Sequence, residues 1–213
     1  MSSSRQLQLA IDAASTAEAV KMAEQIYPNY DIAEIGTPLL IEEGLHALEV
    51  LKNKHPDKTY LADTKITDAG YFEGSSAFKR GADIVTVLGV SDDFTVLQVV
   101  RAAKLYGGRV MADMLHVKDR PGRAKELEEL GVDIICLHTS WDLKDRGIDP
   151  LAELVEVRRS VGCTLAIAGG LALENVRDAL DKGADILVVG AGITKAESPK
   201  ETAAKIMEII SQV

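Results

Sequence analysis

The tetrapeptide Gly81-Ala82-Asp83-Ile84 recurs, identically or with one substitution, as Gly183-Ala184-Asp185-Ile186 and Gly131-Val132-Asp133-Ile134. At each place an amphipathic stretch ends at the glycine, and an apolar run begins after the aspartate. Glycine is favoured just past the end of a helix, and the run that follows has the length of a strand. The junction therefore predicts a repeated unit in which a helix leads into a strand.

The same alternation of apolar and amphipathic stretches fills the rest of the chain. The predicted strands are the apolar runs Leu7–Asp12, Asp31–Ile35, Thr59–Asp63, Asp83–Leu88, Arg109–Met114, Asp133–His138, Thr164–Ala168 and Asp185–Val189. The predicted helices are 16–26, 39–54, 71–80, 92–106, 120–130, 150–160, 172–182 and 199–211. Ser15, Ser91 and Ser198 are the expected N-caps, and Pro199 suits a first helical turn.

The number and character of these elements predict the fold. Strands buried on both faces are continuous apolar runs, as these are. Eight strand–helix units in 213 residues, without a Pro- or Ser-rich linker, predict one domain over residues 1–213, a single (β/α)₈ TIM barrel. The alternative is a doubly wound sheet, which would normally have fewer strands for this length or an obvious switch point. We therefore favour the barrel.

Composition narrows the class of partner. The net charge is −9 and the basic residues are scattered, so neither nucleic acid nor an anionic membrane is an expected partner. No segment approaches the roughly 20 apolar residues that span a bilayer. Cys136 and Cys163 lie in apolar runs without metal-ligand spacing, which indicates buried reduced thiols and a cytoplasmic protein.

The segment Tyr60–Gly70 carries the strongest functional signal. An apolar run ends there in Asp63, Lys65 and Asp68. Residues two apart in a strand point to the same side, so Asp63 and Lys65 are expected to project together. Such a pair at the end of a buried strand indicates a site, although a solvated turn could carry the same residues.

Other predicted strands also carry polar side chains at or near their C-terminal ends, where (β/α)₈ barrels place their chemistry. These residues are Asp12, Glu34, Asp113 and His138. A buried charge is costly unless it is paired or binds a metal. A shared site on one rim explains five such strand ends better than five separate helix caps do.

The last two strands end in glycine-rich turns, Gly169-Gly170 and Gly190-Ala191-Gly192. The loops after strands seven and eight of a barrel commonly bind phosphate through backbone N–H groups and a helix N-terminus. The glycines could instead serve only to turn the chain. Their occurrence at neighbouring strands favours phosphate.

The inventory of side chains indicates a type of chemistry. Glu34 and Asp63 offer hard oxygen ligands suited to Mg²⁺, and Mn²⁺ shares that preference. A metal beside Lys65 can stabilise an oxyanion that develops on a sugar carbonyl. His138 can exchange a proton near neutral pH. Together they predict a metal-stabilised enediolate of a phosphorylated ketose.

These motifs resemble the 3-hexulose-6-phosphate synthase family of the orotidine-5′-phosphate decarboxylase suprafamily, which also contains 3-keto-L-gulonate-6-phosphate decarboxylase. The resemblance covers essentially the whole chain, and Asp-x-Lys-x-x-Asp is its most specific part. The matching segments are 7–12, 31–38, 61–70, 85–89, 113–114, 117–119, 138–139, 166–170 and 189–194.

The resemblance implies reversible, Mg²⁺-dependent condensation of formaldehyde with D-ribulose 5-phosphate to D-arabino-hex-3-ulose 6-phosphate. It implies that Glu34 and Asp63 are metal ligands and that Lys65 stabilises the enediolate. Asp12 and Asp113 would contact substrate hydroxyls or Lys65, and His138 would move the proton at C1. It also implies a homodimer in which Asp68 enters the partner's site.

Two positions depart from the decarboxylase pattern. Decarboxylases of the suprafamily carry an Arg three residues after the histidine and another in the strand-eight loop, where this chain has Trp141 and Ala191. Both departures favour the synthase. Decarboxylation remains the nearest alternative, and a non-catalytic sugar-phosphate-binding barrel is the alternative of another class.

Three further histidines need an interpretation. His116 could touch substrate or cap its loop, and the cap is slightly favoured. His46 and His55 are expected to be surface residues.

Overall fold

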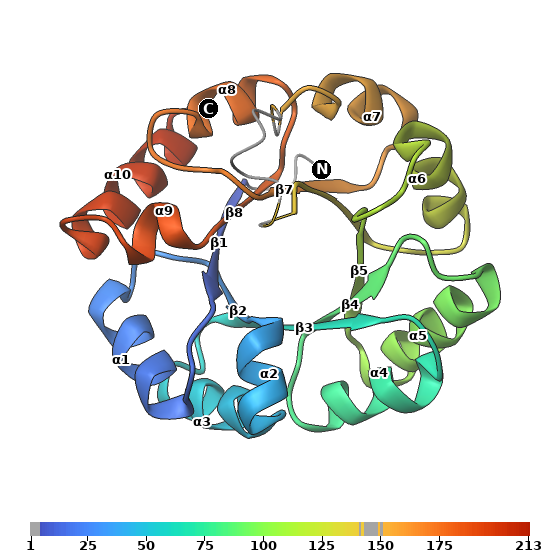
Figure 1. Cartoon of the computed structure of the whole chain (residues 1–213), viewed down its shortest axis with the longest axis horizontal. Coiled ribbons are helices and arrows are strands. Elements are labelled where there is room, and N and C mark those ends of the chain that lie inside the picture. The colour runs from blue at the N-terminus through green and yellow to red at the C-terminus, as the bar shows by residue number, and fades with distance from the viewer. Residues whose placement is uncertain (1–4, 141, 143–148, 150) are drawn as a thin grey trace.

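The computed structural model describes residues 5–140, 142, 149 and 151–213. Its strands pair in parallel in the order of the sequence, and β8 (Ile186–Val189) pairs with β1 (Gln6–Ile11) to close the barrel. Figure 1 looks along the barrel, with the helices arranged as an outer ring around the strands. The predicted (β/α)₈ barrel is confirmed, and the doubly wound sheet is wrong because the sheet has no open edge.

The remaining strands are β2 (Ile32–Ile35), β3 (Thr59–Ile66), β4 (Ile84–Leu88), β5 (Arg109–Asp113), β6 (Ile134–His138) and β7 (Thr164–Ala168). The helices are α1 (Thr16–Ile26), α2 (Thr37–Glu43), α3 (His46–Lys54), α4 (Gly70–Lys79), α5 (Asp93–Tyr106), α6 (Arg120–Glu129), α7 (Leu154–Ser160), α8 (Val176–Asp181), α9 (Ala191–Thr194) and α10 (Pro199–Ser211).

The structure corrects three of the predicted helices and adds one. The helix predicted over 150–160 begins only at Leu154. The predicted helix 39–54 is two helices, because Gly44 adopts φ +61° and ends α2. The helix predicted over 172–182 begins only at Val176, since the preceding residues form a loop that Asn175 holds by accepting the Ala172 N–H and donating to the Gly170 carbonyl. The short helix α9 after β8 was not among the predicted helices.

The recurring junction has a clear structural role at the N-terminal end of the barrel. Each of its glycines lies one residue past the helix C-cap with φ between +96° and +101°, a conformation in which glycine avoids strain. Each of its aspartates accepts a hydrogen bond from a backbone N–H of the preceding strand. The pairs are Asp83 with Tyr60, Asp133 with Val110 and Asp185 with Leu165, at 2.8–2.9 Å.

The three predicted serine caps differ in the structure. Ser15 accepts the backbone N–H of Glu18 and is confirmed as the cap of α1. The cap of α5 is Asp92 rather than Ser91, whose hydroxyl donates to the Ile66 carbonyl. Ser198 occupies the N-cap position of α10 without a capping hydrogen bond from its side chain.

The core is divided by the sheet. One buried cluster fills the barrel and consists of Ile32, Leu61, Ile84, Met111, Ile134, Cys136, Ala166, Ala168, Ile186 and Val188. A larger cluster lies between strands and helices. The buried charged side chains, Glu34, Asp63 and Asp113, lie toward the C-terminal ends of their strands. The charged groups inside the barrel are therefore gathered at the end where the strands terminate.

Both cysteines are free, and the helices are short. Cys136 is buried and Cys163 is half-buried, and both are free thiols. None of the helices in the described residues has the length and apolar character that a bilayer span requires.

Candidate active site

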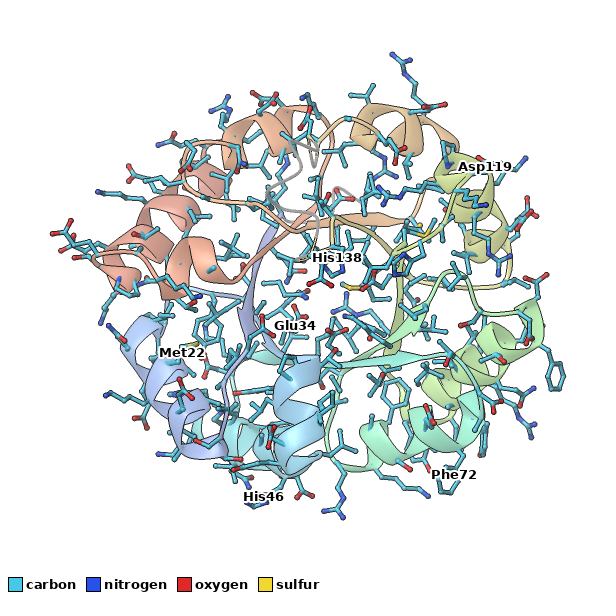
Figure 2. The ribbon with its side chains drawn as sticks, viewed as in Figure 1. Met22, Glu34, His46, Phe72, Asp119 and His138 are labelled. Carbon is cyan, nitrogen blue, oxygen red and sulfur yellow. The ribbon has the colours of Figure 1, made fainter. Side chains whose placement is uncertain are left out.

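Four of the predicted site residues form a continuous chain of polar contacts across the mouth of the barrel. The Lys65 Nζ atom lies 2.5 Å from Asp63 Oδ2 and 3.3 Å from Asp113 Oδ2. The same Asp113 oxygen lies 2.9 Å from His138 Nδ1. These residues come from β3, β5 and β6, and Figure 2 shows His138 and Glu34 inside the ring of strands.

Lys65 reaches this chain through a bulge in β3. The register with β4 pairs Ala62 with Val85 and Ile66 with Val87. Over this interval β3 therefore contains two more residues than β4. Lys65 itself has φ +46°, which is rare for a residue other than glycine. The regular alternation expected for Asp63 and Lys65 is therefore wrong in detail, although the two side chains do meet. Bulges of this kind re-aim side chains next to active sites.

Two threonines that the sequence did not single out hold Asp63 in place. The Thr37 hydroxyl, in the first turn of α2, donates to Asp63 Oδ2 at 2.8 Å. The Thr86 hydroxyl, on β4, donates to Asp63 Oδ1 at 2.9 Å. Both carboxylate oxygens thus have fixed partners, which sets the orientation of the group.

Asp113 is held from a different side. Its Oδ1 atom accepts the backbone N–H of Leu115 at 2.9 Å, which leaves Oδ2 to face Lys65 and His138. Arg120, at the start of α6, donates to the backbone carbonyl of His138 at 3.2 Å and pairs with Glu153. The end of β6 is therefore tied to the helix before it.

Glu34 lies on β2 inside the barrel, and among the described residues its side chain has one hydrogen-bond partner, Gln8 of β1. The Gln8 Nε2 atom donates to Glu34 Oε2 at 2.7 Å. Gln8 is itself buried, and no hydrogen-bond partner for its Oε1 atom occurs among the described residues. A carboxylate offers about four lone-pair positions, so Glu34 retains capacity for further partners.

The electrostatics of the cluster follow from crowding and burial. Burial, followed by the nearby charge of Asp63, raises the pKa of Glu34 to about 8. Burial alone would lower the pKa of Lys65, but Asp63 and Asp113 outweigh it and raise that pKa. Burial likewise opposes ionisation of Asp113, but its hydrogen bond to His138 lowers the pKa. Lys65 is therefore a permanent cation among carboxylates.

Asp12 follows β1 at the mouth and remains partly exposed to solvent. Partial burial and the charge of Asp63 raise its pKa. Gly36, at the end of β2, packs directly against it, since a Cβ atom at Gly36 would overlap the Asp12 carboxylate. A glycine is needed at this position for Asp12 to sit where it does.

The two predicted phosphate loops lie side by side. A Cβ atom at Gly192 would overlap the backbone carbonyl of Leu171, so the loop after β8 touches the loop after β7. Gly169 and Gly170 have φ +88° and +74°, and a Cβ atom at Gly169 would overlap the Thr139 carbonyl. Gly190 is the N-cap of α9, and the first N–H groups of a helix have no intrahelical partner.

Some residues singled out from the sequence lie elsewhere. Asp68 is exposed on the loop between β3 and α4, where its carboxylate accepts the N–H of Ala69 at 2.7 Å. His116 is exposed with φ +62° and lines a groove between the segments that follow β4 and β5, while the cap of α6 comes from Asp119. His46 is exposed as predicted. Trp141 lies outside the described residues.

The expectation that His55 is a surface residue holds only in part, because the residue is half-buried. Its ring stacks on Tyr27 with centroids 4.5 Å apart. Its Nε2 atom is buried. The sequence alone does not reveal this stacked pair, whose two residues are both half-buried.

Comparison with known proteins agrees with this geometry. The chain belongs to the orotidine 5′-phosphate decarboxylase / HUMPS family, which it matches over residues 5–206. The 3-hexulose-6-phosphate synthase of Bacillus subtilis (strain 168) is 41% identical over 208 residues, covering 97% of this chain and 99% of that protein.

Solved structures give the same assignment. The crystal structure of 3-hexulose-6-phosphate synthase from Salmonella typhimurium superposes with a TM-score of 0.94 at 40% identity, covering 97% of this chain and 99% of that one. The 3-keto-L-gulonate-6-phosphate decarboxylase of Vibrio cholerae O1 biovar El Tor is more distant, with a TM-score of 0.87, 27% identity and 98% coverage of both chains.

Proposed function

We propose that the chain condenses formaldehyde with D-ribulose 5-phosphate, reversibly, to D-arabino-hex-3-ulose 6-phosphate. Relatives about 40% identical over nearly the whole chain carry the name of that synthase, and the chain is accordingly a lyase. The observation that carries the proposal is the chain of contacts Asp63–Lys65–Asp113–His138 at the mouth of the barrel. Through Asp113, this chain of contacts places the Lys65 ammonium and the His138 imidazole next to each other.

The reaction needs a carbanion at C1 of the ketose, and these residues can remove the C1 proton and stabilise the charge that results. We assign His138 to proton exchange at C1, since imidazole titrates near neutral pH. Lys65 stabilises the negative charge that then develops on the C2 oxygen, because its ammonium stays protonated among carboxylates. C1 of the resulting 1,2-enediolate attacks the formaldehyde carbon, and the C2 carbonyl re-forms. The formaldehyde oxygen becomes an alkoxide and takes up the proton that His138 removed from C1, which yields the hexulose phosphate. Asp113 orients Lys65 and His138, and Asp12 is assigned to a substrate hydroxyl.

We assign a divalent cation, Mg²⁺ or Mn²⁺, to Glu34 and Asp63. Four carboxylates, those of Asp12, Glu34, Asp63 and Asp113, interact with a single ammonium here, so the donor set suits added positive charge. The described residues hold no group of three or more His, Cys, Asp or Glu side chains with metal-binding geometry. Mg²⁺ commonly uses one or two carboxylates and completes its shell with water and substrate. When bound, it supplies Lewis-acid stabilisation of the oxyanion.

The phosphate of the ketose is assigned to the paired loops at Gly169-Gly170 and Gly190-Ala191-Gly192. Their close contact supports this assignment, because a side chain would not fit at Gly169 or Gly192 and backbone N–H groups in such turns can bind an anion. With Ala191 in the second loop, the phosphate is bound chiefly by the backbone.

We assign Asp68 to the active site of a second copy of the chain in a homodimer. Asp68 is exposed just before α4, and among the described residues its carboxylate has no hydrogen bond or ion pair to the Lys65 cluster of its own barrel. Phe72 on α4 is 76% exposed and projects outward, and Phe94 on α5 is 70% exposed. Large exposed apolar side chains commonly mark protein–protein interfaces, and here they lie on the two helices that follow Asp68. They support a protein partner on this face.

Steady-state assays test the proposal. Formaldehyde should be consumed only when ribulose 5-phosphate and Mg²⁺ are both present, and Lys65→Ala should abolish consumption. Release of CO₂ from 3-keto-L-gulonate 6-phosphate without formaldehyde consumption would make the chain a decarboxylase. Binding of ribulose 5-phosphate without either reaction would make it a non-catalytic barrel. The two free thiols support placement in the reducing cytoplasm.

A further inference from the structure

Thr86 forms hydrogen bonds with three successive residues of the bulge in β3. It lies on β4 and is 3% exposed. It faces the interval between Ala62 and Ile66, where β3 leaves its regular register. Regular ladder pairing is lost at that interval, so the bulge needs other partners.

Thr86 supplies those partners with both its backbone and its side chain. Its carbonyl accepts the Thr64 hydroxyl at 2.9 Å. Its own hydroxyl accepts the backbone N–H of Lys65 at 2.8 Å and donates to Asp63 Oδ1 at 2.9 Å. A threonine hydroxyl has a single proton, so this arrangement requires Asp63 to act as the acceptor.

The Thr86 hydroxyl therefore contacts both the Lys65 backbone and the Asp63 carboxylate. The hydroxyl holds Lys65 in its left-handed conformation, which is sparsely populated unless the surroundings enforce it. The same hydroxyl fixes the carboxylate to which the Lys65 ammonium is paired. We propose that Thr86 is a positioning residue that sets the geometry of Asp63 and Lys65 together. The inference rests on the proposed function only for its kinetic readout.

The test compares variants that separate the hydroxyl from the methyl group. Thr86→Ser and Thr86→Ala both lose the methyl, but only Thr86→Ala loses the hydroxyl, and Thr86→Val keeps the shape without the hydroxyl. Thr164→Val, at the N-terminal end of β7, is the matched control. We expect kcat of Thr86→Val and Thr86→Ala to fall about 10- to 100-fold with KM for ribulose 5-phosphate changed less than about threefold, while Thr86→Ser stays near wild type.

Hydrogen exchange at the Lys65 amide provides a readout that does not depend on turnover. We expect faster exchange in Thr86→Val and Thr86→Ala, and protection near wild type in Thr86→Ser and Thr164→Val. Equal kcat in the Ser and Ala variants, or unchanged Lys65 exchange in the Ala variant, would overturn the inference. A wild-type protein that consumes no formaldehyde would refute the proposed function, whereas the exchange comparison would still decide the role of Thr86.

Discussion

The Oδ2 atom of Asp113 lies 2.9 Å from His138 Nδ1, and the Lys65 ammonium approaches the same oxygen to 3.3 Å. A single carboxylate oxygen therefore orients the group assigned to proton transfer and the group assigned to charge stabilisation. Because the backbone N–H of Leu115 fixes the other oxygen, Asp113 cannot rotate to serve one at the expense of the other.

Asp113→Asn should lower kcat by about 10- to 100-fold, since a neutral amide attracts the Lys65 ammonium less and no longer orients Lys65 and His138 through one charged oxygen. KM for ribulose 5-phosphate should change much less, because the phosphate loops are on β7 and β8. Steady-state kinetics check this, with Asp119→Asn as the control, which removes a charge on the same loop at the cap of α6. A large rise in KM with unchanged kcat would instead make Asp113 a binding residue.

The stabilising effect of Asp113 should depend on pH in a defined direction. Although burial opposes ionisation, the hydrogen bond and charge of His138 and the charge of Lys65 lower the pKa of Asp113. A carboxyl with a lowered folded-state pKa contributes stability above its unfolded pKa of about 3.9, and this stability is lost as pH falls through the folded value.

Urea unfolding of the wild type and Asp113→Asn between about pH 3 and pH 7 measures that effect. The difference in unfolding free energy should be constant above about pH 5 and should shrink below about pH 4. A difference that grows as the pH falls would contradict the lowered pKa.

Asp133→Ala should reduce stability without touching catalysis. Its carboxylate binds the Val110 N–H at the N-terminal end of the barrel, far along β5 from the active-site end. Loss of that hydrogen bond should lower the free energy of unfolding by about 1 kcal/mol. Kcat should stay within about twofold, and the exposed Glu208→Ala on α10 serves as the surface control. A matching loss of activity would show that the two ends of the barrel are coupled.

Complementation tests the dimer proposal. Lys65→Ala and Asp68→Ala homodimers should each be nearly inactive. If Asp68 serves the partner's site, subunit exchange creates heterodimers with one intact site, and an equal mixture should recover about a quarter of wild-type activity. Native mass spectrometry establishes whether heterodimers form. Heterodimers without recovered activity would show that Asp68 does not act across the interface.

The fold was predictable because its signals are local. Glycines at 81, 131 and 183 follow their helices, and the aspartates two residues later bind the neighbouring strand, so each junction carries its own geometry. The helix predicted over 39–54 failed because its apolar pattern continues past Gly44, although the backbone there turns to φ +61°. The pattern of side chains records which face is buried, but not whether the helix is interrupted.

The charged part of the site was also predictable, since buried charges at strand ends are conspicuous. Thr37, Thr86 and Gln8 were not, because a threonine at a helix start, a threonine in a strand and a lone glutamine are all unremarkable in a sequence. Their importance arises from register with other strands, as when Thr86 faces a bulge that begins 20 or more residues earlier in the chain. Such contacts appear only once the barrel has closed.

The most direct test of the proposed reaction follows the formaldehyde carbon. The protein is incubated with ¹³C-formaldehyde, ribulose 5-phosphate and Mg²⁺, and the products are observed by ¹³C NMR. We predict that the label appears at C1 of a hex-3-ulose 6-phosphate, and that Lys65→Ala yields no labelled sugar. Unlabelled sugar phosphate in the wild-type reaction, together with CO₂ release from 3-keto-L-gulonate 6-phosphate, would contradict the proposed synthase activity.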